Sequence, residues 1–341
     1  MKEQIYLSGY TNKGKGIYSA SLDTETKTVS TPQVFVEIDR PTYIDVANNN
    51  HLYAIQEKGD WGGIAAFDLN GSKPEYLNSA LKLGSAPSYV QYDPTRNMVY
   101  SCQFHGSKVY VDKVQEDGTL KSLYTINLTG SGPKPEQDSS KPHFSGLTPD
   151  NKLIICDYGA DTVSIYDLSD TQVPTLLSQY HAKAGSATRH LVFHPTKNIA
   201  YVICELSSEI LVMDYDETTH ELSLRQTIST LPDDFSADDN TAAAIRISND
   251  GKFLYASNRG SDTLAIYQIA ESGEELTNIA YQPVAGKGPR DFDLDPSNNF
   301  LLVANQNTDN LSLFERNTDT GLLSLIKDDI AIPECVCVKF I

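Results

Sequence analysis

Charged and aromatic side chains recur at two equivalent positions of a repeat that runs through the sequence. Three of these side chains are arginines, and a guanidinium group holds a carboxylate or a phosphate through two parallel hydrogen bonds. If one end of the fold gathers these positions, the sequence predicts a positively charged site for a small anion. The first position holds Thr42, Ser88, His143, Arg189, Ala242, Arg290 and Glu334; the second holds Tyr10, Glu57, Phe104, Tyr158, Glu205, Arg259 and Gln306, with His105 beside Phe104.

Some of these side chains have a chemistry that suits catalysis. We expect Glu205 and Glu57 to hold the arginines rigid or to act as a general base. His143 is a candidate proton carrier, because histidine titrates near neutral pH. For each residue, a structural ion pair or a hydrogen-bonded buried histidine is the alternative. The predicted substrate-binding residues are Arg290, His105, Glu57 and Tyr10.

The repeat itself predicts the elements that position these residues. Each unit contains apolar runs of about 4 to 7 residues, rich in Val, Ile, Tyr and Leu and bounded by Gly, Asn, Asp or Pro, which is typical of strands. A period near 50 residues is typical of propeller blades. The units begin at Pro41, Pro87, Pro142, Thr188, Thr241, Pro289 and Pro333.

A single four-stranded sheet cannot cover both of its apolar faces, so successive sheets must stack on one another. The sequence therefore predicts an all-β fold, a seven-bladed β-propeller of four-stranded antiparallel blades, as one domain over residues 1–341. Residues 332–338 resemble the first strand of a blade, and residues 4–8 resemble a second strand. We expect these two segments to pair, so that the C-terminal strand closes the N-terminal blade. Two stacked β-domains are the alternative.

The composition limits the class of partner. The chain has 27 Lys and Arg against 45 Asp and Glu, a formal net charge of −18. Nucleic acids and anionic membranes both select basic surfaces, so we expect neither as a partner. The N-terminal segment lacks the apolar run of a secretory signal, and no segment reaches the length of a membrane span. We therefore expect a cytoplasmic location.

The cysteines and three local motifs carry no strong functional signal. The five cysteines form no Cys-x-x-Cys pair, so we expect free thiols and no metal site. Residues 9–15 match the opening of a P-loop, but Gly16 replaces the magnesium-binding Ser or Thr and a strand follows instead of a helix. There is no Gly-x-Ser-x-Gly and no His-Glu-x-x-His. His194, which precedes Pro195, reads as a turn residue.

Several segments together resemble a known family. They are Ser8-Gly9-Tyr10-Thr11 with Gly16-Ile17-Tyr18, Pro142-His143, Arg189-His190 with Phe193-His194-Pro195, Glu205-Leu206, Tyr255-Ala256-Ser257-Asn258-Arg259-Gly260, and Gly288-Pro289-Arg290. With these segments the sequence resembles the seven-bladed propeller lactonases of the 6-phosphogluconolactonase type along nearly its whole length. Carboxymuconate-lactonising enzymes share this fold.

The resemblance implies a hydrolase that needs no metal or other cofactor and opens 6-phosphogluconolactone in the pentose phosphate pathway. Its partner would be a small anionic sugar lactone, and no protein partner is indicated. The resemblance also implies that His143, Arg189, Glu205 and Arg259 are the catalytic residues. Departures from the family pattern are Ser145, Glu136 before Gln137, and Ala187-Thr188.

Two other functions fit the same residues. A lactonising or cycloisomerising enzyme acting on a muconate-like dicarboxylate also needs cations and one base around a small anion. The second alternative is a propeller that binds a partner and catalyses no reaction, because a fold does not fix a function.

Overall fold

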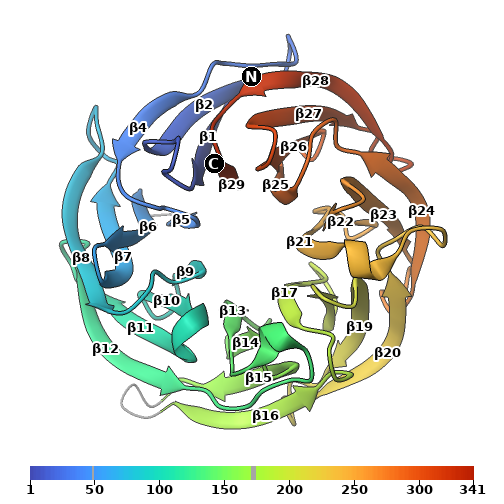
Figure 1. Cartoon of the computed structure of the whole chain (residues 1–341), viewed down its shortest axis with the longest axis horizontal. Coiled ribbons are helices and arrows are strands. Elements are labelled where there is room, and N and C mark those ends of the chain that lie inside the picture. Colours follow the sequence, from blue (N-terminus) through green and yellow to red (C-terminus); the bar gives the residue numbers. More distant parts are fainter. Residues whose placement is uncertain (48–49, 170–173) are drawn as a thin grey trace. The chain divides into compact units, whose positions relative to one another are not determined.

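The computed structural model describes residues 1–47, 50–169 and 174–341. Its strands form seven antiparallel sheets (Figure 1), and the described residues contain three 3-10 turns and no α-helix. The prediction of an all-β chain with seven four-stranded blades is confirmed. No helix in these ranges is long and apolar enough to span a membrane. The 3-10 turns are η1 (Phe104–Gly106), η2 (Pro135–Gln137) and η3 (Ala237–Asp239).

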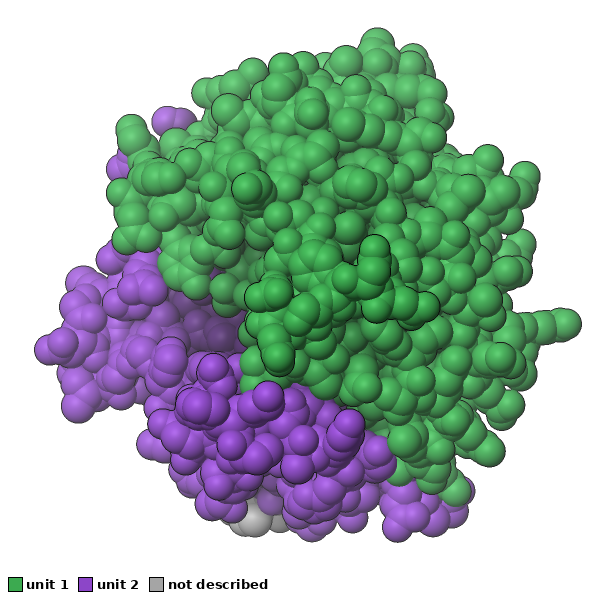
Figure 2. Space-filling view, turned by 45° about the vertical axis from the view of Figure 1, so that its right-hand side comes forward, with its two compact units in different colours: residues 1–34, 190–216, 222–341 green, residues 35–189, 217–221 purple. Residues whose placement is uncertain are grey.

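The chain divides into two compact units, coloured differently in Figure 2. Unit 1 comprises Met1–Val34, His190–Asp216 and Leu222–Ile341, and unit 2 comprises Phe35–Arg189 and Glu217–Glu221. The boundary passes through the strand β17, which leaves Thr188 and Arg189 in unit 2. The expectation of a single domain stays a prediction.

Four sheets lie wholly or mostly in unit 1. The first contains β29 (Cys335–Phe340), β1 (Lys2–Gly9) and β2 (Gly16–Asp23), with β3 (Thr28–Val29) and β4 (Gln33–Glu37) both paired to β2. The others are β17 (Thr188–Phe193), β18 (Ile199–Cys204), β19 (Glu209–Tyr215) and β20 (Leu222–Ser229); β21 (Thr241–Ile247), β22 (Phe253–Arg259), β23 (Thr263–Ile269) and β24 (Leu276–Pro283); and β25 (Pro289–Leu294), β26 (Phe300–Asn305), β27 (Asn310–Arg316) and β28 (Leu323–Ala331).

Three sheets lie in unit 2. They are β5 (Ile44–Val46), β6 (His51–Lys58), β7 (Trp61–Asp68) and β8 (Glu75–Leu83); β9 (Tyr89–Asp93), β10 (Met98–Gln103), β11 (Lys108–Val114) and β12 (Leu120–Asn127); and β13 (Pro142–Leu147), β14 (Leu153–Asp157), β15 (Thr162–Asp167) and β16 (Thr175–His181). Strands follow one another in chain order across each sheet.

The recurrent tyrosine of the repeat is the third residue of a blade's second strand. Tyr201 in β18 and Tyr255 in β22 are fully buried, like their equivalents Tyr53 and Tyr100 in unit 2. In unit 1 their hydroxyls donate to backbone carbonyls of the next blade, Tyr201 to Gly273 at 2.7 Å and Tyr255 to Gly321 at 2.8 Å. Buried hydroxyls are usually hydrogen-bonded, and these two bonds each join a blade of unit 1 to the next one.

The predicted closure of the N-terminal blade is confirmed. Strand β29 pairs antiparallel with β1, with Leu7 opposite Val338 and Ser8 opposite Cys337. The register shifts at Gly9, which lies opposite Cys335. A side chain on Gly9 would meet the Glu334 carbonyl oxygen at 2.1 Å, so this close approach requires glycine.

The two repeat positions that hold the candidate residues lie at the same end of each blade's inner hairpin. In four blades, the backbone N–H of the second-position residue donates to a carbonyl in the segment that leads into that blade's first strand. The bonds are Tyr10 to Glu334 at 3.2 Å, Glu57 to Asp39 at 3.2 Å, Tyr158 to Lys141 at 3.0 Å and Gln306 to Gly288 at 3.1 Å.

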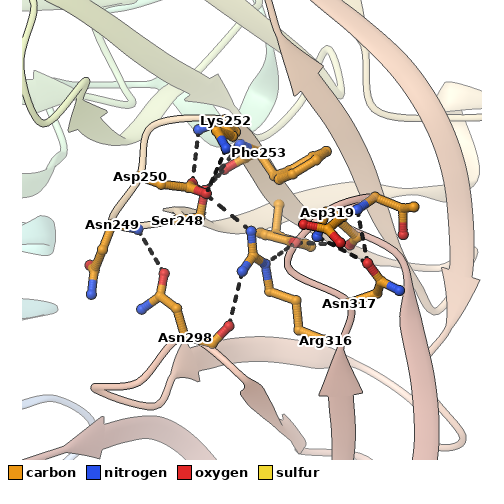
Figure 3. A network of polar contacts seen from close by, with 12 residues as sticks. Ser248, Asn249, Asp250, Lys252, Phe253, Asn298, Arg316, Asn317 and Asp319 are labelled. Carbon is orange, nitrogen blue, oxygen red and sulfur yellow. Dashed lines mark hydrogen bonds and ion pairs between the residues drawn. The ribbon is translucent and has the colours of Figure 1, made fainter.

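A buried arginine joins two blades of unit 1 at the strand ends shown in Figure 3. Arg316, the last residue of β27, donates from Nε to the Tyr255 hydroxyl at 2.7 Å and from Nη1 to the Asn298 carbonyl at 3.0 Å (Figure 3). Its guanidinium lies over the Phe253 ring at 5.3 Å, and its Nη2 is 4.0 Å from Asp250. We infer a structural role for this network. Three of its contacts link β27 to β22 or to the turn before β22, and the bond to Asn298 fixes β27 to the turn before β26.

Candidate active site

An ion pair between Glu205 and Arg259 is the centre of the candidate site in unit 1. Glu205 follows β18, and its backbone carbonyl accepts a hydrogen bond from the Ala242 N–H of β21 at 3.1 Å. Arg259 ends β22, and its Nη2 lies 2.9 Å from Glu205 Oε1. The side chains are 18% and 15% exposed, so the pair is partly shielded from water while remaining accessible. Glu205 therefore pairs with an arginine, which is one of the two roles expected of it.

The backbone on both sides of Arg259 is fixed. The preceding Asn258 is fully buried and donates to the Thr230 carbonyl at 2.6 Å, while its side-chain oxygen accepts from the Thr230 hydroxyl at 2.8 Å. The following Gly260 has a φ of +134°, and a side chain there would meet the Asp239 carbonyl oxygen at 2.1 Å. In the Asn258-Arg259-Gly260 motif, the first and last residues thus fix the backbone, and the arginine between them supplies the functional side chain.

Arg290 is the extra residue of a β-bulge. In the pairing of β25 with β26, Pro289 lies opposite Asn305 and Asp291 opposite Ala304, which leaves Arg290 without a cross-strand partner. Bulges re-aim side chains and recur beside active sites. Among the residues that the structure describes, the Arg290 guanidinium makes no hydrogen bond and no ion pair.

Arg290 interacts electrostatically with the Glu205–Arg259 pair. Burial lowers the pKa of Arg290 from its ordinary value, and the charge of Arg259 lowers it further, while Tyr10, Glu205 and Asp291 act in the opposite direction. An arginine pKa lies far above neutrality, so Arg290 still carries its charge at pH 7. The structure thus brings together four of the predicted residues in unit 1: Tyr10, Glu205, Arg259 and Arg290.

Asp291 follows Arg290 in the chain but has other partners. Its Oδ1 accepts from Arg246 Nη2 at 2.8 Å, and its Oδ2 accepts from the Val338 N–H at 3.0 Å. Arg246 also reaches Asp293 at 3.4 Å. These contacts connect β21, β25 and β29, so the buried Asp291 fixes the strand on one side of the Arg290 bulge.

Tyr10 and the P-loop-like segment lie at the end of β1. The Glu334 carboxylate accepts from the Lys13 N–H at 2.8 Å and from the Asn12 side chain at 3.0 Å. The donors of this segment therefore bind a carboxylate of the protein itself. Residues 16–23, which follow the segment, form the strand β2. A strand thus follows residues 9–15, as the sequence predicted, where a P-loop requires a helix. Glu334 occupies one of the two repeat positions, but it faces this loop.

His143 is the corresponding bulge residue of unit 2. Pro142 lies opposite Asp157 and Phe144 opposite Cys156, so His143 is the extra residue at the start of β13. Its ring is buried and meets the Phe104 ring edge-on at 5.7 Å. His105 also contacts Phe104 edge-on, at 5.0 Å, but it is exposed on the turn η1. Tyr158 packs on the Phe104 ring at 5.4 Å.

Two buried aspartates order the segments that lead to His143 and Arg189. Asp157 accepts from the Lys141 N–H at 2.7 Å and from the Ser140 hydroxyl. Burial raises the pKa of Asp157, although its hydrogen bonds favour the charged form and lower the pKa in part. Asp161 accepts from the Ala187 N–H at 2.6 Å, which holds the chain just before β17. Ala187 has a φ of +60°, so this departure from the family pattern places alanine in the left-handed region.

Arg189 and Glu57 complete the predicted set in unit 2. Arg189 is buried near the start of β17, where Thr188 donates to the carbonyl oxygens of Asp157 at 3.1 Å and Thr162 at 2.8 Å. Glu57 lies 3.4 Å from Arg40 and is partly exposed, so it holds an arginine outside the predicted set.

Two other interpretations from the sequence, of the cysteines and of His194, are confirmed. All five cysteines are buried free thiols, and burial raises the pKa of Cys102 to about 12. His194 accepts from the Thr196 N–H at 3.2 Å, as expected of a turn residue. In the described part of the chain, no three His, Cys, Asp or Glu residues gather where they could hold a metal ion.

Sequence reasoning missed the residues that support the site. Asp291 and Arg246 stand in regular strand positions without any motif, so only the three-dimensional pairing of β21, β25 and β29 shows their role. The bulges at His143 and Arg290 carry one usable signal, because each follows a proline at the start of an inner strand.

Comparisons with known proteins agree with this fold and show the family. Residues 4–340 match the family model described as lactonase, 7-bladed beta-propeller. A Bacillus subtilis protein named 6-phosphogluconolactonase is 37% identical over 98% of this chain and 97% of its own length. A crystal structure of a protein from Lactobacillus plantarum is 41% identical, with full coverage of both chains and a TM-score of 0.97. The structure of a Pseudomonas aeruginosa periplasmic gluconolactonase is 25% identical, covers all of this chain and 99% of its own, and has a TM-score of 0.93.

Proposed function

Because the chain belongs to the seven-bladed β-propeller lactonase family, we propose that it hydrolyses 6-phospho-D-glucono-1,5-lactone to 6-phosphogluconate. The observation that carries the proposal is the partly buried ion pair between Glu205 and Arg259, together with the charge of Arg290, which interacts with this pair. The relative named 6-phosphogluconolactonase supports this choice of substrate.

The chemistry requires stabilisation of a developing oxyanion. Water attacks the ring carbonyl, the carbonyl oxygen becomes negatively charged, and the ring C–O bond then breaks. The ring oxygen takes a proton and the product leaves as a carboxylate. A guanidinium held in place before the reaction stabilises the oxyanion without having to reorganise. Arg259 has this property, because Glu205 and the carbonyl oxygens of Thr241 and Ala242 contact it.

A second group must accept the proton of the attacking water. Glu205 already accepts from Arg259 through Oε1, whereas histidine titrates near neutral pH, where a general base works best. We therefore propose His143 as the proton acceptor and Glu205 as the positioning residue of Arg259. Arg189 is proposed as a further stabilising cation.

The direct test measures hydrolysis of freshly generated 6-phosphogluconolactone, coupled to a dehydrogenase that oxidises the acid. We expect turnover well above the spontaneous rate, and a loss of about 10² to 10³ in kcat for Arg259→Ala, the range for removing one oxyanion donor. For His143→Gln we expect a loss of about 10² to 10⁴.

Arg225→Ala is the matched control. Arg225 also pairs with a carboxylate, that of Asp214, but it is 54% exposed on the outer strand β20. Its activity should match the wild type. A folded wild-type protein that gives no acceleration would refute the substrate, and unphosphorylated glucono-1,5-lactone would then be tested in the same way. Unchanged turnover by Arg259→Ala would refute the assigned role.

A further inference from the structure

Arg290 differs from the other arginines around it. Glu205 pairs with Arg259, and Asp291 and Asp293 pair with Arg246. Arg290 has neither an ion pair nor a hydrogen bond within the described ranges. Two arginines and one glutamate at this place leave one positive charge uncompensated.

The backbone that carries Arg290 is held from both sides. Before it, the Gly288 N–H donates to Asp262 at 2.8 Å, with Gly288 at a φ of +67°. After it, the Asp291 carboxylate is anchored by Arg246 and by the Val338 N–H. The bulge therefore presents a guanidinium from a rigid base, which lowers the entropic cost of binding a ligand.

A partly buried charge without a partner destabilises the free protein, and an anionic ligand offsets that cost. The proposed lactone substrate has one anionic group, its phosphate, because the lactone ring is neutral. A phosphate monoester carries about −1.5 to −2 charges at pH 7 and three acceptor oxygens, which match the donors of a guanidinium.

We propose that Arg290 binds the phosphate group of the substrate and so makes the site select phosphorylated over unphosphorylated lactones. This specificity role rests on the lactonase function proposed above. It assigns Arg259 and Arg290 to different ends of one ligand, with the first at the carbonyl and the second at the phosphate.

The experiment compares wild type, Arg290→Met and Arg290→Lys, with Arg225→Met as the exposed control. The first readout is the melting temperature in a phosphate-free buffer and after addition of inorganic phosphate, against sodium chloride at equal ionic strength. We expect phosphate to stabilise the wild type and the control. Arg290→Met should melt higher than the wild type without phosphate, because an unpaired charge has been removed, and should not respond to phosphate.

The second readout is the ratio of kcat/KM for 6-phosphogluconolactone to kcat/KM for glucono-1,5-lactone. We expect this ratio to fall about 10- to 100-fold in Arg290→Met, with KM for the phosphorylated lactone carrying most of the change, and Arg290→Lys to restore part of it. The control should keep the wild-type ratio.

Two results overturn the proposal: a phosphate response that persists in Arg290→Met, or a ratio that does not change. A different pattern separates this proposal from the lactonase function. If the wild type hydrolyses neither lactone, yet phosphate stabilises it and not Arg290→Met, the lactonase assignment fails and the anion site at Arg290 stands.

Discussion

Replacing Glu205 by glutamine tests whether this residue positions Arg259 or takes part in the chemistry. Glutamine keeps the shape of the side chain and an oxygen acceptor but removes the charge. The Glu205–Arg259 contact is 2.9 Å long, whereas Arg259 meets the carbonyl oxygens of Thr241 and Ala242 only at 3.4 Å. The ion pair is therefore the tightest hold on this guanidinium.

The magnitude follows from the type of bond that is lost. A hydrogen bond between charged partners contributes about 1.5 to 3 kcal/mol and a neutral one about 0.5 to 1.5 kcal/mol. Both side chains are less than one-fifth exposed, so solvent screening reduces the difference only modestly. We expect Glu205→Gln to lose about 1 to 2 kcal/mol in the free energy of unfolding. In kcat/KM the same range is about 5- to 30-fold.

A double-mutant cycle with Arg259→Gln provides the assay. Urea unfolding followed by far-UV circular dichroism measures stability, and lactone hydrolysis measures kcat/KM. If Glu205 acts only through Arg259, the double variant should be no less active than Arg259→Gln alone. A further loss of about 10² or more from Glu205→Gln in the Arg259→Gln background would refute the positioning role and make Glu205 the general base.

Three further outcomes are expected from the structure. Burial, and then the neighbouring Asp295, raise the pKa of Glu3 above its ordinary value of 4.5. The contribution of Glu3 to stability is therefore present below pH 4.5 and is lost as the pH rises through the raised value, so Glu3→Gln should gain stability over the wild type as pH increases in urea titrations. The buried thiols, with the pKa of Cys102 raised to about 12, should resist iodoacetamide at pH 8 in the folded protein and react in urea, as mass spectrometry would show. Arg316→Met should lose about 2 to 4 kcal/mol in the free energy of unfolding, because two hydrogen bonds and a ring contact disappear, whereas the exposed Arg225→Met should change by less than about 1 kcal/mol.

The sequence predicted the blades because strands are recognised from residues that are close together in the chain. Alternating and continuous apolar runs mark strands, and the recurrent tyrosine at Tyr201 and Tyr255 marks the same place in successive sheets. Pairing of Glu205 with Arg259 was also predictable, since the two residues occupy the same repeat position at the end of the second strand in successive blades.

The bulges and their consequences were not predictable in the same way. An extra residue in one strand changes which side chain faces the site, and its place depends on hydrogen bonding between strands. Arg290 and His143 therefore reach their positions through shifts in strand register, for which the preceding proline is the one signal in the sequence. Glu334 shows the reverse: it occupies an equivalent repeat position, but its φ of +47° turns it to the loop that follows Tyr10.

The pairing of β1 with β29 has a consequence for the order of folding. These strands are separated by more than three hundred residues, and a ribosome makes β29 after every other strand. Until then β1 presents an unpaired edge, and Tyr10 lacks the Glu334 carbonyl that receives its N–H. Nascent chains should thus carry several finished blades before the binding site exists, and variants that lose β29 should accumulate as aggregates joined through β1.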